Sequence, residues 1–392
     1  MSSSRVASLI KSGQGQSAAI ERAPGIHESR GVGNSYLLTT RDGDVLVNAG
    51  TLADARRGKE LFSKVSSAPV RVIVLTQSHA NQYGGLEVYK TADNVVIAQR
   101  TYVEDRRYSE ALSAHYRRGS RRIFGGITGP TSEIVPTREV MPDLLFDSVH
   151  TFELGGRRFE LHSVPGGETR SALLVWLPDE RIALVGNLFG PLFGNQPNLN
   201  TIRGDKPRSA LEFVASVEKL RALGPAMVLT GHEVITDEVD RSIARIADSV
   251  RWLHDRTVEG MNAGVPLREL MQLRVPEALA LTEEYGKVAW NVRAIWHEYT
   301  GWFDPDRGTT ELFGATPASV TPALLELIGV EKLLERARRF VADEQPLHAL
   351  QLLDLAPPDD AVAREVRRAA LELLLARTDN LFERRWILSE LG

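Results

Sequence analysis

A polar loop between Thr76 and Gly85 holds the first residues whose types could do chemistry. It directly follows the apolar, β-branched run Val70–Leu75, and it carries His79 together with three amide side chains, which are those of Gln77, Asn81 and Gln82. Sheet proteins often place ligand-contacting side chains in such a loop, straight after a buried strand. The imidazole could hold a metal ion or transfer a proton, and the amides could donate hydrogen bonds to a ligand.

The chain has no cysteine, so thiolate ligands, disulfides and a cysteine nucleophile are excluded. Any metal site would have to use the nine histidines with carboxylates and amides.

The residue pattern predicts that two sets of strands, with helices between them, position these residues. Apolar runs of strand length alternate with segments of helical spacing, and a Gly-containing turn joins the first two strands as a hairpin. The expected strands are 35–39, 45–47, 70–75, 94–98, 152–153, 158–164, 172–177, 182–185 and 226–230, and the expected helices are 52–65, 86–91, 102–122, 209–223 and 237–254. This alternation predicts an α/β fold, an αββα sandwich with its functional loops at one edge.

From about residue 256 the chain reads as almost entirely helical. The segments 331–342, 346–355 and 359–377 are amphipathic and are separated by prolines, much like helical hairpins. We therefore expect a loosely held lead-in over 1–30, a sandwich domain over 31–255 and a helical domain over 256–392. A single helical pair cannot bury its own apolar face, so we expect it to pack on the sandwich domain or on a second copy of the chain.

Taken in order, these motifs resemble those of the metallo-β-lactamase superfamily. The family loop His-x-His-x-Asp-His appears here as Gln77, His79, Asn81 and Gln82, and Pro165-Gly-Gly-Glu168-Thr stands where the family has Pro-Gly-His-Thr. A glutamate at that position is characteristic of the alkylsulfatase branch. The segment 292–304 closely resembles the start of the alkylsulfatase dimerisation domain. The resemblance covers roughly residues 31–390 and implies a homodimer.

The resemblance also implies site roles. In the family frame His79 and Glu168 belong to one zinc position, His232 belongs to the other, and Asn187 stands where an acidic residue bridges the two. Carboxamides are poor zinc ligands, and Glu168 supplies the only carboxylate of this set, so we expect a degenerate centre with no metal or with one divalent ion, zinc by preference. Substrate-binding positions matched by the resemblance are Arg203, Arg293 and Tyr299, with Gln77, Asn81, Gln82 and Asn187 lining the pocket.

Each candidate also has a purely structural explanation. His79 and His232 could be buried histidines satisfied by backbone groups, and Glu168 could cap a turn. Arg203 could simply pair with Asp205, and Tyr299 could pack on Trp302. The arginines between 106 and 122 are expected to form a solvated helix face in preference to a substrate funnel.

The resulting hypothesis is a pocket for an anionic small molecule, with Glu168 or His79 as acid or base and the arginines holding the anion. Hydrolysis and elimination both suit such a set. A non-catalytic binding or scaffold protein and a zinc hydrolase with unorthodox ligands are the alternatives. The net charge of −4 gives no indication of a nucleic-acid partner, and no apolar window approaches the length of a membrane span. We expect a soluble, cytoplasmic protein.

Overall fold

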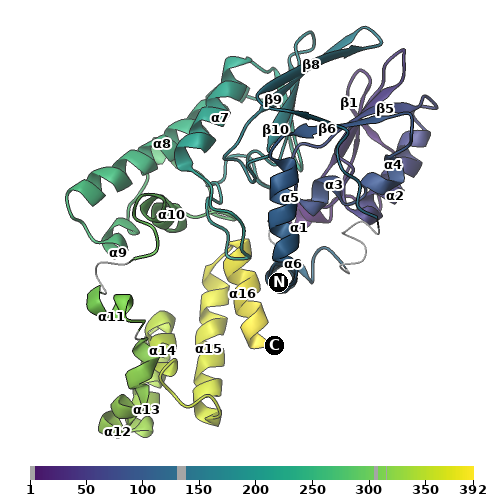
Figure 1. Ribbon diagram of the computed structural model, residues 1–392. Helices are drawn as coiled ribbons and strands as arrows, with labels where there is room; N and C mark the ends of the chain where they lie inside the picture. The colour runs from purple at the N-terminus through teal and green to yellow at the C-terminus, as the bar shows by residue number, and fades with distance from the viewer. Residues whose placement is uncertain (1–4, 130–137, 304–307, 315) are drawn as a thin grey trace. The chain divides into compact units, whose positions relative to one another are not determined.

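Two β-sheets face each other in the first part of the chain in the computed structural model, which describes residues 5–129, 138–303, 308–314 and 316–392 (Figure 1). Neighbouring strands of the seven-stranded sheet follow one another in sequence: β1 (Ile20–Ala23), β2 (Ile26–Ser29), β3 (Ser35–Leu38), β4 (Asp44–Val47), β5 (Val70–Val74), β6 (Val95–Gln99) and β7 (Leu144–Phe146). The six-stranded sheet has the order β13 (Val234–Ile235), β12 (Met227–Thr230), β11 (Ile182–Gly186), β10 (Leu173–Leu177), β9 (Arg157–Ser163) and β8 (Val149–Leu154).

Helices cover the outer faces of both sheets. The first part of the chain contains α1 (Arg5–Ile10), α2 (Leu52–Ser63), α3 (Ala80–Tyr83), α4 (Leu86–Tyr89), α5 (Tyr102–Ala111), α6 (Ser113–Phe124), α7 (Ala210–Ala222), α8 (Val239–Asn262), α9 (Leu267–Leu270), the 3₁₀ helix η2 (Glu277–Leu279) and α10 (Val288–Thr300). Helices α2 and α4 lie outside the first sheet, and α7 and α8 lie outside the second (Figure 1). The predicted αββα sandwich is therefore confirmed.

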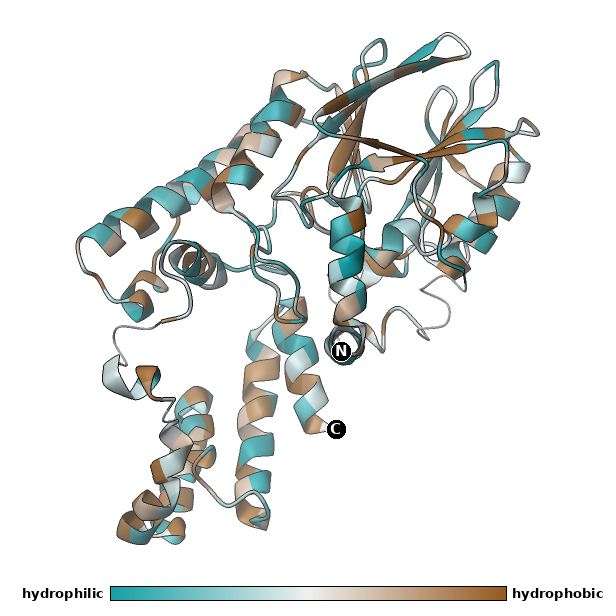
Figure 2. Ribbon diagram, viewed as in Figure 1, coloured by the Kyte–Doolittle hydropathy of each residue, from teal (hydrophilic) through white to brown (hydrophobic). Residues whose placement is uncertain are grey.

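Alternation along the strands builds the core in layers. In β3, Tyr36 and Leu38 face the space between the sheets, while Leu37 belongs to the outer cluster under α2 and α4. Side chains alternate between the faces of a strand, so a strand buried on both sides reads as continuously apolar. The strands are accordingly mostly brown in Figure 2, whereas the helices show both brown and teal along their length.

The chain divides into two compact units, Met1–Tyr299 (unit 1) and Thr300–Gly392 (unit 2). Unit 2 consists of α11 (Gly308–Leu312), η3 (Pro317–Val320), α12 (Thr321–Ile328), α13 (Val330–Ala342), α14 (Pro346–Leu353), α15 (Ala361–Arg377) and α16 (Leu381–Leu391). The predicted domain boundary after residue 255 lies inside the continuous helix α8, and that division stays a prediction. In the described part of the chain, no helix is long and apolar enough to cross a lipid bilayer.

The structure differs from the expectation for residues 1–30. Instead of a loose lead-in, β1 and β2 form the edge of the seven-stranded sheet, with Ile26 fully buried. The buried carboxylate of Glu28 accepts hydrogen bonds from Arg22, Arg30 and Asn34. These partners lie only two to six residues from Glu28, but the contacts are polar, so apolar periodicity did not indicate a sheet edge here.

Candidate functional site

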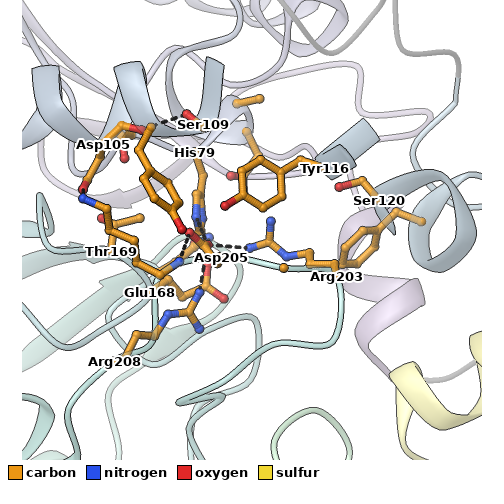
Figure 3. Close-up of a pocket in the computed structure, with 18 of the residues that line it drawn as sticks. His79, Asp105, Ser109, Tyr116, Ser120, Glu168, Thr169, Arg203, Asp205 and Arg208 are labelled. Carbon is orange, nitrogen blue, oxygen red and sulfur yellow. Dashed lines mark hydrogen bonds and ion pairs between the residues drawn. The ribbon is translucent and has the colours of Figure 1, made fainter. Parts of the chain in front are cut away.

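A cavity of about 1450 Å³ opens at the edge of unit 1 where the strands β5, β11 and β12 end. The loops that follow these three strands place His79, Asn187 and His232 in its lining, and the loop after β9 adds Glu168. Strands β11 and β12 are parallel neighbours in the six-stranded sheet, so their carboxyl ends share one edge. The loop after β5 of the facing sheet reaches the same cavity, which brings residues distant in sequence together. The long connection between β11 and α7 and the helices α5 and α6 complete the wall (Figure 3).

His79 lies between two carboxylates. Its Nε2 atom is 3.0 Å from Oδ2 of Asp205, and its Nδ1 atom is 3.4 Å from Oε2 of Glu168 and 3.2 Å from the side-chain amide of Gln77. His79 precedes α3 with an extended backbone and makes no side-chain capping bond, so its imidazole faces the cavity. Burial alone would lower the pKa of His79, but the hydrogen bonds to Asp205 and Glu168 outweigh burial and raise it.

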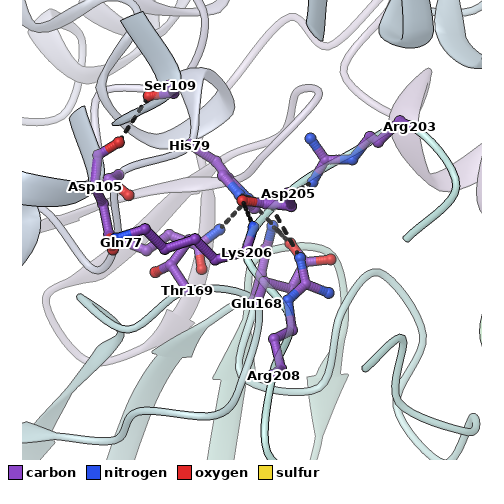
Figure 4. Close-up of polar contacts among 12 residues, drawn as sticks. Gln77, His79, Asp105, Ser109, Glu168, Thr169, Arg203, Asp205, Lys206 and Arg208 are labelled. Atoms are coloured by element: carbon purple, nitrogen blue, oxygen red, sulfur yellow. Dashed lines mark hydrogen bonds and ion pairs between the residues drawn. The ribbon is translucent and has the colours of Figure 1, made fainter. Parts of the chain in front are cut away.

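The carboxylate of Asp205 contacts three side chains that can carry positive charge. Besides His79, its Oδ2 atom lies 3.2 Å from Nη2 of Arg208 and 3.5 Å from Nη2 of Arg203 (Figure 4). The Arg208 side chain is only 4% exposed, and it also donates a hydrogen bond to the carbonyl of Asn198. Burial would raise the pKa of Asp205, yet the hydrogen bond from His79 and the nearby positive charges hold it well below its usual value. We call His79, Arg203 and Arg208 the cation cluster.

Glu168 is the second carboxylate in contact with the cation cluster, beside His79. Its carboxylate is buried and accepts hydrogen bonds from the Asn187 amide at 3.2 Å and the Tyr285 hydroxyl at 3.5 Å. Although burial would raise the pKa of Glu168, the interaction with His79 and the guanidinium charges keep it well below its usual value. Glu168 is thus an ionised group with weak basicity, suited to orienting His79.

A group of uncharged polar side chains lies on segments adjacent to the cation cluster. Gln82 is fully buried, and within the described ranges neither its amide oxygen nor its amide nitrogen has a hydrogen-bond partner. Oδ1 of Asn187 and Nδ1 of His232 are likewise buried and unpaired, whereas Asn81 donates a weak hydrogen bond to the carbonyl of Val32. Burial lowers the pKa of His232 to about 4, so this imidazole is neutral at pH 7.

This donor set does not fit the metal centre that the resemblance implies. Among the described residues, no group of three His, Cys, Asp or Glu side chains is arranged to hold a metal ion. Both ring nitrogens of His79 face carboxylates, and those carboxylates are already neutralised by Arg203 and Arg208. A further divalent cation would compete with these fixed positive charges and would find mainly amide oxygens as additional ligands.

The structure places six of the predicted site residues in the cavity lining: His79, Asn81, Glu168, Asn187, Arg203 and His232. The other four, Gln77, Gln82, Arg293 and Tyr299, are not part of the lining, and Gln77 and Gln82 are buried beneath it. Arg293 is exposed and does not line the cavity, because on α10 the face that does so carries Ala294, His297 and Glu298. Tyr299 is 54% exposed, and its hydroxyl lies 2.8 Å from Nε2 of His254. These two residues therefore lie outside the cavity lining of unit 1, and their role in holding an anion stays a prediction.

Several site residues were missed by sequence reasoning. Asp205 was considered only as an ion-pair partner of Arg203, and that pairing is present, but its contact with His79 spans 126 residues. Arg208 and Tyr285 were not singled out. The segment 106–122 was expected to be a solvated helix face, yet α5 and α6 line the cavity. One signal was available: Arg203, Asp205, Lys206 and Arg208 crowd four charges into six positions.

The neutral state of His232 predicts a pH dependence of stability. With a folded-state pKa of about 4 against about 6.5 when unfolded, His232 binds fewer protons in the folded chain between these values. The contribution of neutral His232 to the free energy of unfolding is therefore complete above pH 6.5. About 3 kcal/mol of this free energy is lost as the pH falls from 6.5 to 4. His232→Gln should remove this part of the slope in urea unfolding followed from pH 7 to 4. The control His115→Gln, at an exposed histidine, should keep the pH dependence of wild type. Equal slopes in wild type and His232→Gln would show that His232 is not the group responsible.

Comparison with known proteins gives matches over most of the chain. Residues 29–232 match the family model of the metallo-beta-lactamase superfamily, and residues 270–391 match the model for alkyl sulfatase dimerisation. A linear primary-alkylsulfatase of Pseudomonas sp. (strain ATCC 19151) is 28% identical over 90% of this chain and 72% of its own length. An (R)-specific secondary-alkylsulfatase of Pseudomonas sp. is 24% identical over 92% of this chain and 60% of its own length.

Solved structures agree on the fold. The stereoselective inverting sec-alkylsulfatase Pisa1 from Pseudomonas sp. superimposes with a TM-score of 0.83 at 20% identity, covering 97% of this chain and 69% of that one. A double mutant of the same enzyme gives a TM-score of 0.84 at 21% identity, covering 98% of this chain and 66% of that one. At this identity the likeness concerns the fold alone.

Proposed function

Because the chain belongs to the metallo-β-lactamase superfamily, in its alkylsulfatase-like branch, we propose that it is a sulfatase-like hydrolase acting on a small organic sulfate. The reaction takes place in the cavity of unit 1 and uses the cation cluster where relatives of the fold use metal ions. Water adds across the ester bond and yields an alcohol and hydrogen sulfate. The observation that supports this most directly is the convergence of His79, Arg203 and Arg208 on Asp205 at the cavity wall.

The charge of the cluster suits a monoanion. Three cationic groups, with His79 protonated, face the two carboxylates of Asp205 and Glu168, which leaves one positive charge in excess. Guanidinium groups donate hydrogen bonds in a planar fork that matches the oxygens of a sulfate. Nε of Arg203 and Nε of Arg208 are buried and have no hydrogen-bond partner among the residues that the structure describes, so each retains a donor for such a ligand.

Proton transfer falls to His79 in this proposal. Asp205 orients the imidazolium ring through Nε2 at 3.0 Å, and Glu168 faces Nδ1 at the longer distance of 3.4 Å. On substrate binding the Nδ1–H turns from Glu168 to the ester oxygen at which the bond breaks and donates its proton there, while Arg203 and Arg208 hold the sulfate oxygens. Asn187 and His232, which line the cavity, offer uncharged hydrogen-bonding groups to water or to the alcohol part of the substrate.

A panel of alkyl and aryl sulfates tests this function by the release of inorganic sulfate. We expect hydrolysis of at least one sulfate ester, and we expect it to persist in the presence of a strong chelator. Arg208→Gln should weaken binding of inorganic sulfate about tenfold, the loss of roughly one charge-assisted hydrogen bond. Absence of both sulfate binding and sulfate release across the panel would overturn the proposal.

A binding protein that does not turn over its ligand is the second candidate. The low pKa of Glu168 favours it, because a carboxylate of such weak basicity activates water poorly. In that case calorimetry would detect binding of an organic sulfate while no inorganic sulfate appears during prolonged incubation.

We also propose a homodimer formed through the region that matches the alkyl sulfatase dimerisation model. Unit 2 exposes large apolar side chains, among them Phe313 at 83% and Leu327 at 82%, which is unusual for a surface that stays in water. Sedimentation at micromolar concentration should give twice the chain mass, and a monomer would contradict the proposal.

A further inference from the structure

One face of helix α6 lines the cavity. The contributing residues recur at intervals of three and one, as expected for a single helical face, and they are Ser113, Tyr116, Arg117, Ser120, Arg121 and Phe124. The helix carries four arginines and no acidic residue, and two of the arginines, Arg117 and Arg121, belong to this face. A cationic helix face therefore borders the same cavity as the cation cluster.

The two arginines differ from the other cations of the cavity in their partners. Each of the others has a carboxylate partner, in the pairs Arg106–Glu139, Arg170–Glu104, Arg203–Asp205, Lys206–Glu104 and Arg208–Asp205. Arg117 donates only to the backbone and hydroxyl oxygens of Ser113, and Arg121 forms no ion pair within the described part of the chain. Two guanidinium groups at the cavity thus lack an internal counter-ion.

Carboxylates without an ion pair also line the cavity, and they do not neutralise this face. Of Glu110, Glu212 and Glu298, only Glu110 lies on the α5–α6 segment, one negative charge against two positive ones. Glu212 lies at the start of α7 and Glu298 lies near the end of α10.

Close backbone contact fixes α6 against the cation cluster. A β-carbon at Gly119 would lie 2.6 Å from the carbonyl oxygen of Arg203, so only glycine allows the helix to approach this far. Gly204, at a φ of +87°, leaves room in the same way for the ring of Tyr116, which lies beside Arg203 in Figure 3. Arg117 and Arg121 flank Gly119 by two residues on either side, about 6 Å apart along the helix axis.

We propose that the cavity takes an organic sulfate with a second anionic group, a carboxylate or another sulfate, and that Arg117 and Arg121 bind this second group. The inference rests on the proposed function, in which the cation cluster holds the first sulfate. At about 1450 Å³ the cavity exceeds the roughly 300–1,000 Å³ of sites for drug-sized ligands, so it has room for both anions and a linking skeleton. Tyr108, Tyr116 and Phe124 offer apolar surface to that skeleton.

Two sulfates with the same skeleton test the proposal: octyl sulfate, and its counterpart that bears a carboxylate at the far end of the chain. Calorimetry on the full chain should show the dianion binding roughly tenfold more tightly than octyl sulfate, the value of about one charge-assisted contact. The double variant Arg117→Gln/Arg121→Gln should lose this preference while its affinity for octyl sulfate stays within about threefold of wild type.

The matched control is Arg118→Gln/Arg122→Gln, which removes the same charge from the same helix at positions outside the cavity lining. This control should retain the preference. Equal affinity of wild type for the two sulfates, or an equal loss of preference in the control, would overturn the second-anion site while leaving the proposed function intact. Failure of wild type to bind either sulfate would instead contradict the proposed function itself.

Discussion

Asp205→Ala is expected to lower the free energy of unfolding of unit 1 by about 3–5 kcal/mol, the range for breaking a buried ion pair by removing one partner. Asp205 is the shared counter-ion of His79, Arg203 and Arg208, and Arg208 is almost fully buried. Without the carboxylate, these buried and partly buried cations would face one another, with Glu168 beside His79 as a remaining counter-ion. Urea unfolding at pH 7, followed by circular dichroism, measures the loss.

The control for this experiment is Asp240→Ala. Asp240 also pairs with an arginine, Arg221, at 2.8 Å, but its side chain is 69% exposed. Solvent screening makes such surface pairs contribute little, so this variant should unfold close to wild type. If Asp205→Ala proved as mild as Asp240→Ala, the cluster would not depend on a shared carboxylate.

His79→Gln should reduce the rate constant kcat for hydrolysis of a sulfate ester by a factor of roughly 10²–10⁴, the usual contribution of a positioned acid or base. The amide can still form hydrogen bonds with Asp205 and Glu168, but it cannot donate a proton to a leaving oxygen. Since Arg203 and Arg208 remain, KM should change much less than kcat. For wild type, kcat should also fall as the pH rises through the raised pKa of His79.

His162→Gln provides the comparison for His79. His162 on β9 also lies beside a carboxylate, with Nε2 at 3.2 Å from Glu160, but it does not line the cavity. Its replacement should leave kcat unchanged. Full activity in His79→Gln would assign the proton transfer to another group.

The sandwich could be predicted from sequence because its signals are local. The turn before Asp44 and the apolar runs that became β5, β10, β11 and β12 follow directly from residue patterning. The edge strands β1 and β2 were missed, because the buried Glu28 is held by polar contacts with Arg22 and Asn34, each six residues away. A prediction based on apolar periodicity fails where a buried charge and its hydrogen bonds decide the structure.

Only some residues of the candidate site could be predicted from the sequence. His79 comes in the loop directly after the buried run that forms β5, which the residue pattern indicated. The resemblance supplied Glu168, Asn187 and His232, which lie in loops after strands of the other sheet. Asp205 and Arg208 come from an irregular connection whose path no periodicity reveals. Arg293 was assigned to the site by resemblance. Each residue along a helix turns the side chain by about 100°, so Ala294 on α10 lines the cavity while the preceding Arg293 is exposed to solvent.

Metal content, combined with activity, tests most directly whether arginines and a protonated histidine act here without a pair of metal ions. Protein purified without added metal and dialysed against a strong chelator should contain well under one zinc ion per chain by mass spectrometry and should hydrolyse its sulfate ester at an unchanged rate. About two tightly held zinc ions per chain, whose removal abolishes hydrolysis and whose return restores it, would contradict this.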